Sequence, residues 1–206
     1  MYITGYDNSY GSISNPMHVT WNGSGWDYPS VALTDKALGL AAFYPYDGNS
    51  VTTSVPMRLN PQTDYLASAE YTVSNQHPNV KFTMDHLLSC IKVNVDSSSD
   101  VAVTVQKIPV EATYDMKTQV VSPLTTRGSA SGLSEVLIFP AAGCLSMDVA
   151  YNGKSYHYIT PQLDFQKGKK YTFNLTVDST EDLKLVGDVS ITPWASGGDY
   201  DGIIKN

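Results

Sequence analysis

The chain has 206 residues, of which 42% are hydrophobic, and its 20 acidic side chains outnumber 13 basic ones to give a net charge of −7. That charge repels a phosphate backbone, which argues against a nucleic-acid-binding protein. No apolar run approaches the roughly 18 residues that span a bilayer, so a membrane-spanning helix is excluded. The length suits one large or two small β domains, each with its own core.

Strands are predicted along most of the chain, because apolar and polar residues alternate wherever apolar residues cluster. The clearest case is 171–177, where tyrosine, phenylalanine, leucine and valine occupy the odd positions. In chain order the predicted strands are 17–21, 38–46, 64–73, 80–95, 101–105, 110–114, 134–139, 145–151, 155–160, 171–177 and 183–194. No stretch of comparable length has a helical period. Many short strands predict an all-β sandwich or barrel.

Turn-forming residues separate these strands, at 47–49, 97–100, 127–129, 152–153 and 167–168. Asn152-Gly153 is the strongest signal, since a type I′ turn needs positive φ at both central residues. Arg127-Gly128-Ser129 is interpreted as another turn.

The alternation changes phase within 80–95, from apolar even positions to apolar odd positions after about Leu87. A one-residue slip exchanges the faces of a strand, so this segment needs a bulge or passes between two packing environments. We therefore predict a domain join here. The polar segment 74–79 is the expected connector, which divides the chain into an N-terminal domain at 1–78 and a C-terminal domain at 79–206, with a tail at 195–206.

Catalytic, metal and cofactor sites are not predicted. The histidines His18, His77, His86 and His157 are scattered without ligand spacing, and no nucleophile or phosphate-binding motif is present. Asp199 and Asp201 before Gly202 lack the distal glutamate of a calcium loop. Cys90 and Cys144 are too few for a disulfide scaffold, and the sequence leaves open whether they pair.

Aromatic residues near the N-terminus suggest a second kind of site. Trp21, Trp26 and Tyr28, with Tyr44 and Tyr46, are candidates for a platform that stacks on a sugar ring. The competing interpretation is ordinary packing between strands, because tryptophan and tyrosine bury large areas with one polar partner each.

A series of short motifs resembles the fimbrillin-like (Mfa-like or FimA-like) proteins of Bacteroidales, which are components of type V pili. The motifs are LAAFYPYDG (40–48), PQTDYLAS (61–68), VKFTMDHLLSCIKVNV (80–95), ATYDMKT (112–118), GKKYTFNLTV (168–177) and VSITPW (189–194). The resemblance spans most of the chain in the family's order.

The resemblance implies two tandem transthyretin-like (Greek-key) β-sandwich domains, the second opened by the strand that carries His86. It also implies export as a lipoprotein, signal removal, a place on the outer-membrane surface and assembly with other pilin subunits. Two family features are missing, because 2–21 contains neither a lipobox cysteine nor a cleavage arginine, and the only arginines are Arg58 and Arg127. Either a leader and first strand have been removed, or this member is processed differently.

The C-terminal tail is the candidate assembly element. In such pili a subunit's C-terminal segment is thought to fill a groove in its neighbour by β-augmentation, which needs reach, flexibility and apolar anchors. Glycines in 195–202 supply flexibility, and Tyr200, Ile203 and Ile204 are the candidate donor residues. Ile203 and Ile204 are adjacent, so only one can face inward. The competing interpretation is that the tail folds back over its own domain or frays.

The sequence therefore predicts a non-enzymatic structural or adhesive component of a cell-surface pilus, without cofactors. Its expected partners are other pilin subunits and a receptor or glycan on a host or bacterial surface. The alternative is a surface lipoprotein that binds glycan through its exposed aromatic residues.

Overall fold

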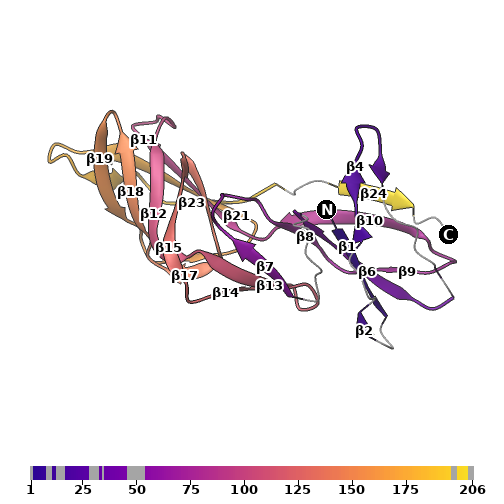
Figure 1. The fold of residues 1–206 in the computed structure, drawn as a ribbon. Helices are drawn as coiled ribbons and strands as arrows, with labels where there is room; N and C mark the ends of the chain where they lie inside the picture. Colours follow the sequence, from indigo (N-terminus) through magenta and orange to yellow (C-terminus); the bar gives the residue numbers. More distant parts are fainter. Residues whose placement is uncertain are drawn as a thin grey trace.

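The computed structural model describes residues 2–7, 11–12, 17–27, 33, 35–45, 54–195 and 199–203, and within these ranges every regular element is a β-strand. This confirms the predicted all-β class. The molecule is elongated, with an N-terminal part at one end and a C-terminal part at the other (Figure 1). The assignment to tandem transthyretin-like domains stays a prediction.

The N-terminal part is built on one eight-stranded sheet. Its main path is β2 (Gly11–Ser12), β1 (Tyr2–Asp7), β6 (Leu38–Tyr44), β8 (Leu66–Ser68), β10 (Asn79–His86) and β24 (Asp199–Ile203); β3 (Met17–His18) joins β1 and β9 (Tyr71–Val73) joins β6. A separate hairpin, β4 (Thr20–Trp21) with β5 (Trp26–Asp27), projects from this part (Figure 1).

The C-terminal part contains two packed sheets. One is β16 (Glu135–Ile138), β11 (Ser89–Val95), β21 (Lys169–Val177) and β22 (Leu183–Leu185), with β23 (Ser190–Pro193) on β21. The other is β15 (Arg127–Leu133), β12 (Ala102–Pro109), β18 (Ser146–Tyr151) and β19 (Lys154–Ile159), beside the short pair β17 (Ala141–Gly143) and β20 (Leu163–Phe165). Strands β11 and β21 pair in parallel. Tyr158 and Phe173 meet between the two sheets at 6.4 Å.

A three-stranded sheet lies between the two parts (Figure 1). It consists of β14 (Val120–Pro123), β13 (Glu111–Asp115) and β7 (Ser54–Arg58), so it joins segments more than fifty residues apart. Phe43 of β6 stacks on Tyr114 of β13 at 5.9 Å. The two parts therefore share backbone pairing as well as side-chain packing.

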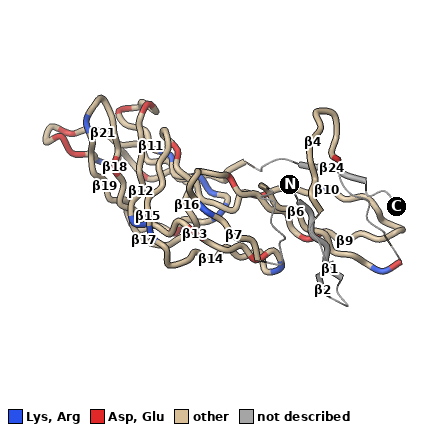
Figure 2. The backbone as a smooth tube through the Cα atoms, viewed as in Figure 1, with Lys and Arg blue, Asp and Glu red and all other residues tan. Residues whose placement is uncertain are grey.

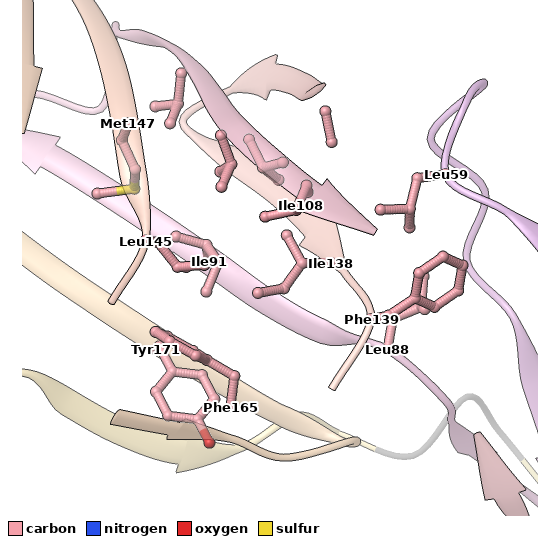
Figure 3. Packing of buried hydrophobic residues seen from close by; sticks show 14 of the residues in the cluster. Leu59, Leu88, Ile91, Ile108, Ile138, Phe139, Leu145, Met147, Phe165 and Tyr171 are labelled. Carbon is pink, nitrogen blue, oxygen red and sulfur yellow. The ribbon is translucent and has the colours of Figure 1, made fainter. Parts of the chain in front are cut away.

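The larger hydrophobic core continues from one part into the other. Leu59, which follows β7, belongs to the same buried cluster as Ile91, Ile138 and Met147 of the C-terminal part (Figure 3). A second cluster covers the opposite face of the N-terminal sheet, where Leu40 and Met84 are fully buried. Burying side chains of this size is worth about 1.5–3 kcal/mol each, so these clusters supply the main driving force for folding.

The hairpin turn and the phase change are both seen in the structure. Asn152 and Gly153 have φ values of 48° and 75° and connect β18 to β19, as a type I′ turn requires. The phase changes because β10 ends at His86 and β11 begins at Ser89 in a different sheet. The buried residues of β10 thus face the smaller core, and those of β11 face the larger one.

The predicted boundary at 78/79 differs from the pairing. Strand β10 bonds to β8 and β24, which places residues 79–86 in the N-terminal sheet rather than in the C-terminal domain. The strand carrying His86 consequently belongs to the first sheet instead of opening the second unit. The polar connector at 74–79 is a turn within the N-terminal part, closed by Ser74 and His77 through paired backbone hydrogen bonds.

The turn predicted at Arg127-Gly128-Ser129 is wrong, because these residues begin β15. Gly128 is there for space rather than for flexibility: a Cβ at this position would lie 2.9 Å from the side chain of Val110. A glycine inside a strand commonly marks such a close approach.

Candidate functional site

The C-terminal tail adds an outer strand to the N-terminal sheet. Strand β24 runs antiparallel to β10, with Tyr200 opposite Phe82 and Ile203 opposite Asn79. Of the three predicted donor residues, Tyr200 and Ile203 lie in this strand, and Ile204 lies outside the described residues. The segment beyond Trp194 therefore contributes a further strand, β24, to the N-terminal sheet.

Strand β10 buries one face in the smaller core and needs a neighbouring strand along its outer edge. Val80, Phe82 and Met84 alternate into the smaller core, whereas Lys81 is exposed. Strand β8 pairs only with residues 84–86, and β24 pairs with residues 79–83. Without β24, backbone donors and acceptors along this edge would be open to another chain.

The tail begins at a fixed point near the junction of the two parts. The indole ring of Trp194 lies parallel to the imidazole of His86, with ring centres 3.7 Å apart. The Trp194 backbone N–H donates to the carbonyl of Gly168 at 2.8 Å. His86, which is almost fully buried, contacts Asp64 through Nδ1 at 2.9 Å. The segment that follows Trp194 therefore starts beside the end of β10 along which β24 runs.

The junction is also held by the side chain of Gln62. Its Oε1 accepts from the backbone N–H of Leu137 at 2.6 Å, and its Nε2 donates to the Leu137 carbonyl at 3.2 Å. Leu137 lies in β16, the terminal strand of its sheet. One glutamine thus bonds to the edge of β16 as a neighbouring strand would and ties the N-terminal part to it.

The hairpin brings two of the predicted platform residues together. Trp21 and Trp26 are directly opposite each other and pack edge to face, with ring centres 5.3 Å apart. Tyr28 and Tyr46 lie outside the described residues. Tyr44 joins the two tryptophans around a pocket, together with His18, Leu66 and Met84. Sequence reasoning missed the last three as pocket residues, because they come from separate strands and carry no local signal.

Neither a metal site nor a reactive cysteine is assembled within the described residues. No group of three histidine, cysteine or acidic side chains there is arranged to hold a metal ion. Cys90 and Cys144 are both free, so they do not pair. Burial, reinforced by the carboxylate of Glu135, raises the pKa of the Cys90 thiol to about 12, which keeps it protonated and unreactive.

Charged side chains near Cys90 form an ion-pair cluster rather than a catalytic site. Glu135 lies 3.0 Å from the Lys170 ammonium and 3.6 Å from that of Lys92. Burial acts to raise the pKa of Glu135, but the hydrogen bond and charge of Lys170 outweigh it and hold that pKa below its ordinary value. Elsewhere, acidic residues gather in turns at the end of the molecule remote from β24 (Figure 2).

A membrane-crossing helix is not found among the described residues. The family model described as "Fimbrillin-like" matches residues 5–194 of the chain. A comparison with curated protein sequences gives no significant match.

Several solved structures with a similar fold come from Bacteroides species. A putative cell adhesion protein of Bacteroides uniformis is 18% identical with a TM-score of 0.70, and the alignment covers 94% of this chain and 91% of that one. One from Bacteroides ovatus is 16% identical with a TM-score of 0.60, covering 100% and 88%. A fimbrial protein of Bacteroides vulgatus is 15% identical with a TM-score of 0.54, covering 94% and 92%. At these identities the likeness concerns the fold.

Proposed function

This chain belongs to the fimbrillin-like family, whose members are structural components of pili, and we propose that it joins neighbouring subunits by exchanging its C-terminal strand. The observation that carries the proposal is the pairing of β24 with the edge of β10. In the single chain this strand completes its own sheet. In a polymer, the same strand would complete the sheet of the next subunit.

Strand exchange conserves the bonds that the single chain makes. The five residue pairs from Asn79–Ile203 to Thr83–Asp199 can form within one chain or between two chains with the same register. An exchanged identical element is a low-cost route to association, because the open and closed forms differ mainly in the connecting segment. Here that segment is 195–198, which includes Gly197 and Gly198.

The closed form competes with assembly. A tail tethered by a short linker meets its own acceptor edge at an effective concentration in the millimolar range, far above ordinary protein concentrations. Pairing within the chain therefore keeps the subunit monomeric in dilute solution. Assembly requires high local concentration or a neighbour that presents an open edge.

The wider proposal concerns place and activity. The subunit acts at the outer-membrane surface after export and signal removal, with other pilin subunits as partners and a receptor or glycan as the target of its exposed loops. It is not an enzyme in this proposal, which is supported by the inert Cys90 thiol. The family match gives no support to glycan binding as the main role.

Deletion of residues 198–206 tests the proposal. The shortened chain is expected to keep its C-terminal sheets and to lose incorporation into polymers, measured by size-exclusion chromatography and electron microscopy. Glu181→Ala, in the exposed turn between β21 and β22, is the matched control and should assemble normally. Unchanged assembly by the folded, shortened chain would rule out the tail as donor.

A further inference from the structure

A pocket lies beneath the β4–β5 hairpin, beside strands β6, β8 and β10 of the N-terminal sheet. Its volume is about 290 Å³. Trp21, Trp26 and Tyr44 contribute aromatic walls, and Leu66 and Met84 contribute buried aliphatic side chains from the smaller core.

The hairpin holds its two tryptophans in a defined arrangement. Asn22 accepts hydrogen bonds at Oδ1 from the backbone N–H groups of Ser24 and Gly25, at 3.0 and 2.9 Å. Its Nδ2 donates to Asp27 at 3.0 Å, across the turn. Because the turn is fixed in this way, the aromatic walls are organised before a ligand arrives, which lowers the entropy cost of binding.

Large aromatic surfaces remain exposed at the pocket. Trp21 is 56% exposed and Tyr44 is 46% exposed, although both residue types usually bury their rings. Exposed aromatic area around a concave site is typical of a surface that becomes covered by a ligand. Packing against Trp26 therefore covers only part of Trp21.

The size and polarity of the pocket restrict its ligand. A cavity of roughly 150 Å³ holds a benzene ring, so this pocket takes one six-membered ring with substituents. His18, Thr20 and the tyrosine hydroxyl add polar groups to its lining, which suit a ligand with hydroxyl groups. Among the described residues, none that lines the pocket is aspartate, glutamate, lysine or arginine, which favours a neutral ligand.

The aliphatic side chains narrow the choice further. A ligand hydroxyl placed against Leu66 would lose its hydrogen bonds to water without replacement, whereas a methyl group would be buried favourably. A sugar ring stacks its C–H face on an aromatic wall and turns its hydroxyls to the solvent. We propose that this pocket binds the neutral, methyl-bearing terminal sugar of a glycan, either a 6-deoxyhexose or an N-acetylhexosamine.

Binding is tested on the monomer, so the result does not depend on strand exchange. L-Fucose and N-acetyl-D-glucosamine represent the two sugar classes, and L-galactose and D-glucose are their matched controls without the methyl group. Saturation-transfer NMR and titration calorimetry should show a Kd on the order of 1–10 mM for one methyl-bearing sugar, as expected for a small ligand. The strongest transfer should reach its methyl protons, and the control sugar should bind at least roughly fivefold more weakly.

Variants locate the site. Trp21→Ala should weaken binding at least roughly tenfold, whereas Ile159→Ala, an exposed aliphatic change on β19, should leave it unchanged. Trp21→Phe retains a ring and should give an intermediate Kd, which provides a second test if the alanine variant folds poorly. The proposal is overturned if neither methyl-bearing sugar binds at up to roughly 50 mM, if the methyl group makes no difference, or if the folded Trp21→Ala variant binds normally.

Discussion

Replacing Gln62 with alanine should destabilise the whole molecule, although Gln62 lies in a loop. The substitution removes the two bonds to Leu137, at 2.6 and 3.2 Å, and a third from Nε2 to the Leu59 carbonyl at 3.0 Å. Each bond contributes about 0.5–1.5 kcal/mol net, and this junction is only partly buried, so water replaces some of the loss. We expect the free energy of unfolding to fall by about 1–3 kcal/mol.

The measurement is urea unfolding followed by both tryptophan fluorescence and circular dichroism. Wild type should unfold in one transition by both probes, since the two parts share the core and the β7–β13 pairing. Asn94→Ala is the matched control: it removes one exposed bond between neutral side chains, to Asn174 at 2.8 Å, and should cost less than about 1 kcal/mol. A loss below about 0.5 kcal/mol in the Gln62→Ala variant would refute the reasoning.

Three further predictions concern side chains of the C-terminal part. Cys144 is exposed, whereas Cys90 is buried and its pKa is raised. A thiol reagent at pH 8 should therefore modify one cysteine in the folded protein and two in urea. Two rapid modifications in the native state would contradict this. The pKa of Glu135 is lowered, so the stability that it contributes is present above its unfolded pKa of 4.5 and is lost as pH falls through its folded pKa. Glu135→Gln should therefore reduce the difference in unfolding free energy between pH 7 and pH 3. An unchanged difference would be evidence against the ion pair. Trp194→Ala removes the stacking on His86 and should speed hydrogen exchange of β10 and β24 amides, with unchanged β18–β19 amides as the internal control; equal protection in both proteins would mean that the stacking does not hold the tail.

Local signals in the sequence predicted local structure well. Asn152-Gly153 gave the correct turn because both residues tolerate positive φ, and the phase change near Leu87 marked the passage from β10 to β11. Gly128 was misinterpreted for a physical reason: a glycine signals either a turn or a close approach, and only the position of Val110 decides between them.

Long-range pairing was beyond the reach of sequence patterns. Nothing within 54–58 indicates that β7 pairs with β13, because the partner lies more than fifty residues away. For the same reason, the sequence did not show that β10 belongs to the N-terminal sheet, because its partners β8 and β24 are identified only by pairing. Tyr200 and Ile203 were named as candidate donor residues of the tail, but the strand that pairs with them in the same chain could be identified only from the register with β10. The pocket under the hairpin likewise needed three separate strands to be brought together.

The most direct test of strand exchange is a disulfide across β10 and β24, in a Cys144→Ser background. Lys81 and Asp201 are directly opposite, and opposite Cα atoms in antiparallel strands lie roughly 4.5–5.5 Å apart, within the range that a disulfide spans. A chain with both Lys81→Cys and Asp201→Cys should close its own disulfide and confirm the register. When chains carrying one substitution each are mixed and assembled, exchange predicts covalent dimers between the two kinds of chain. Assembled pili in which no such dimers form, while the double variant still closes within itself, would contradict it.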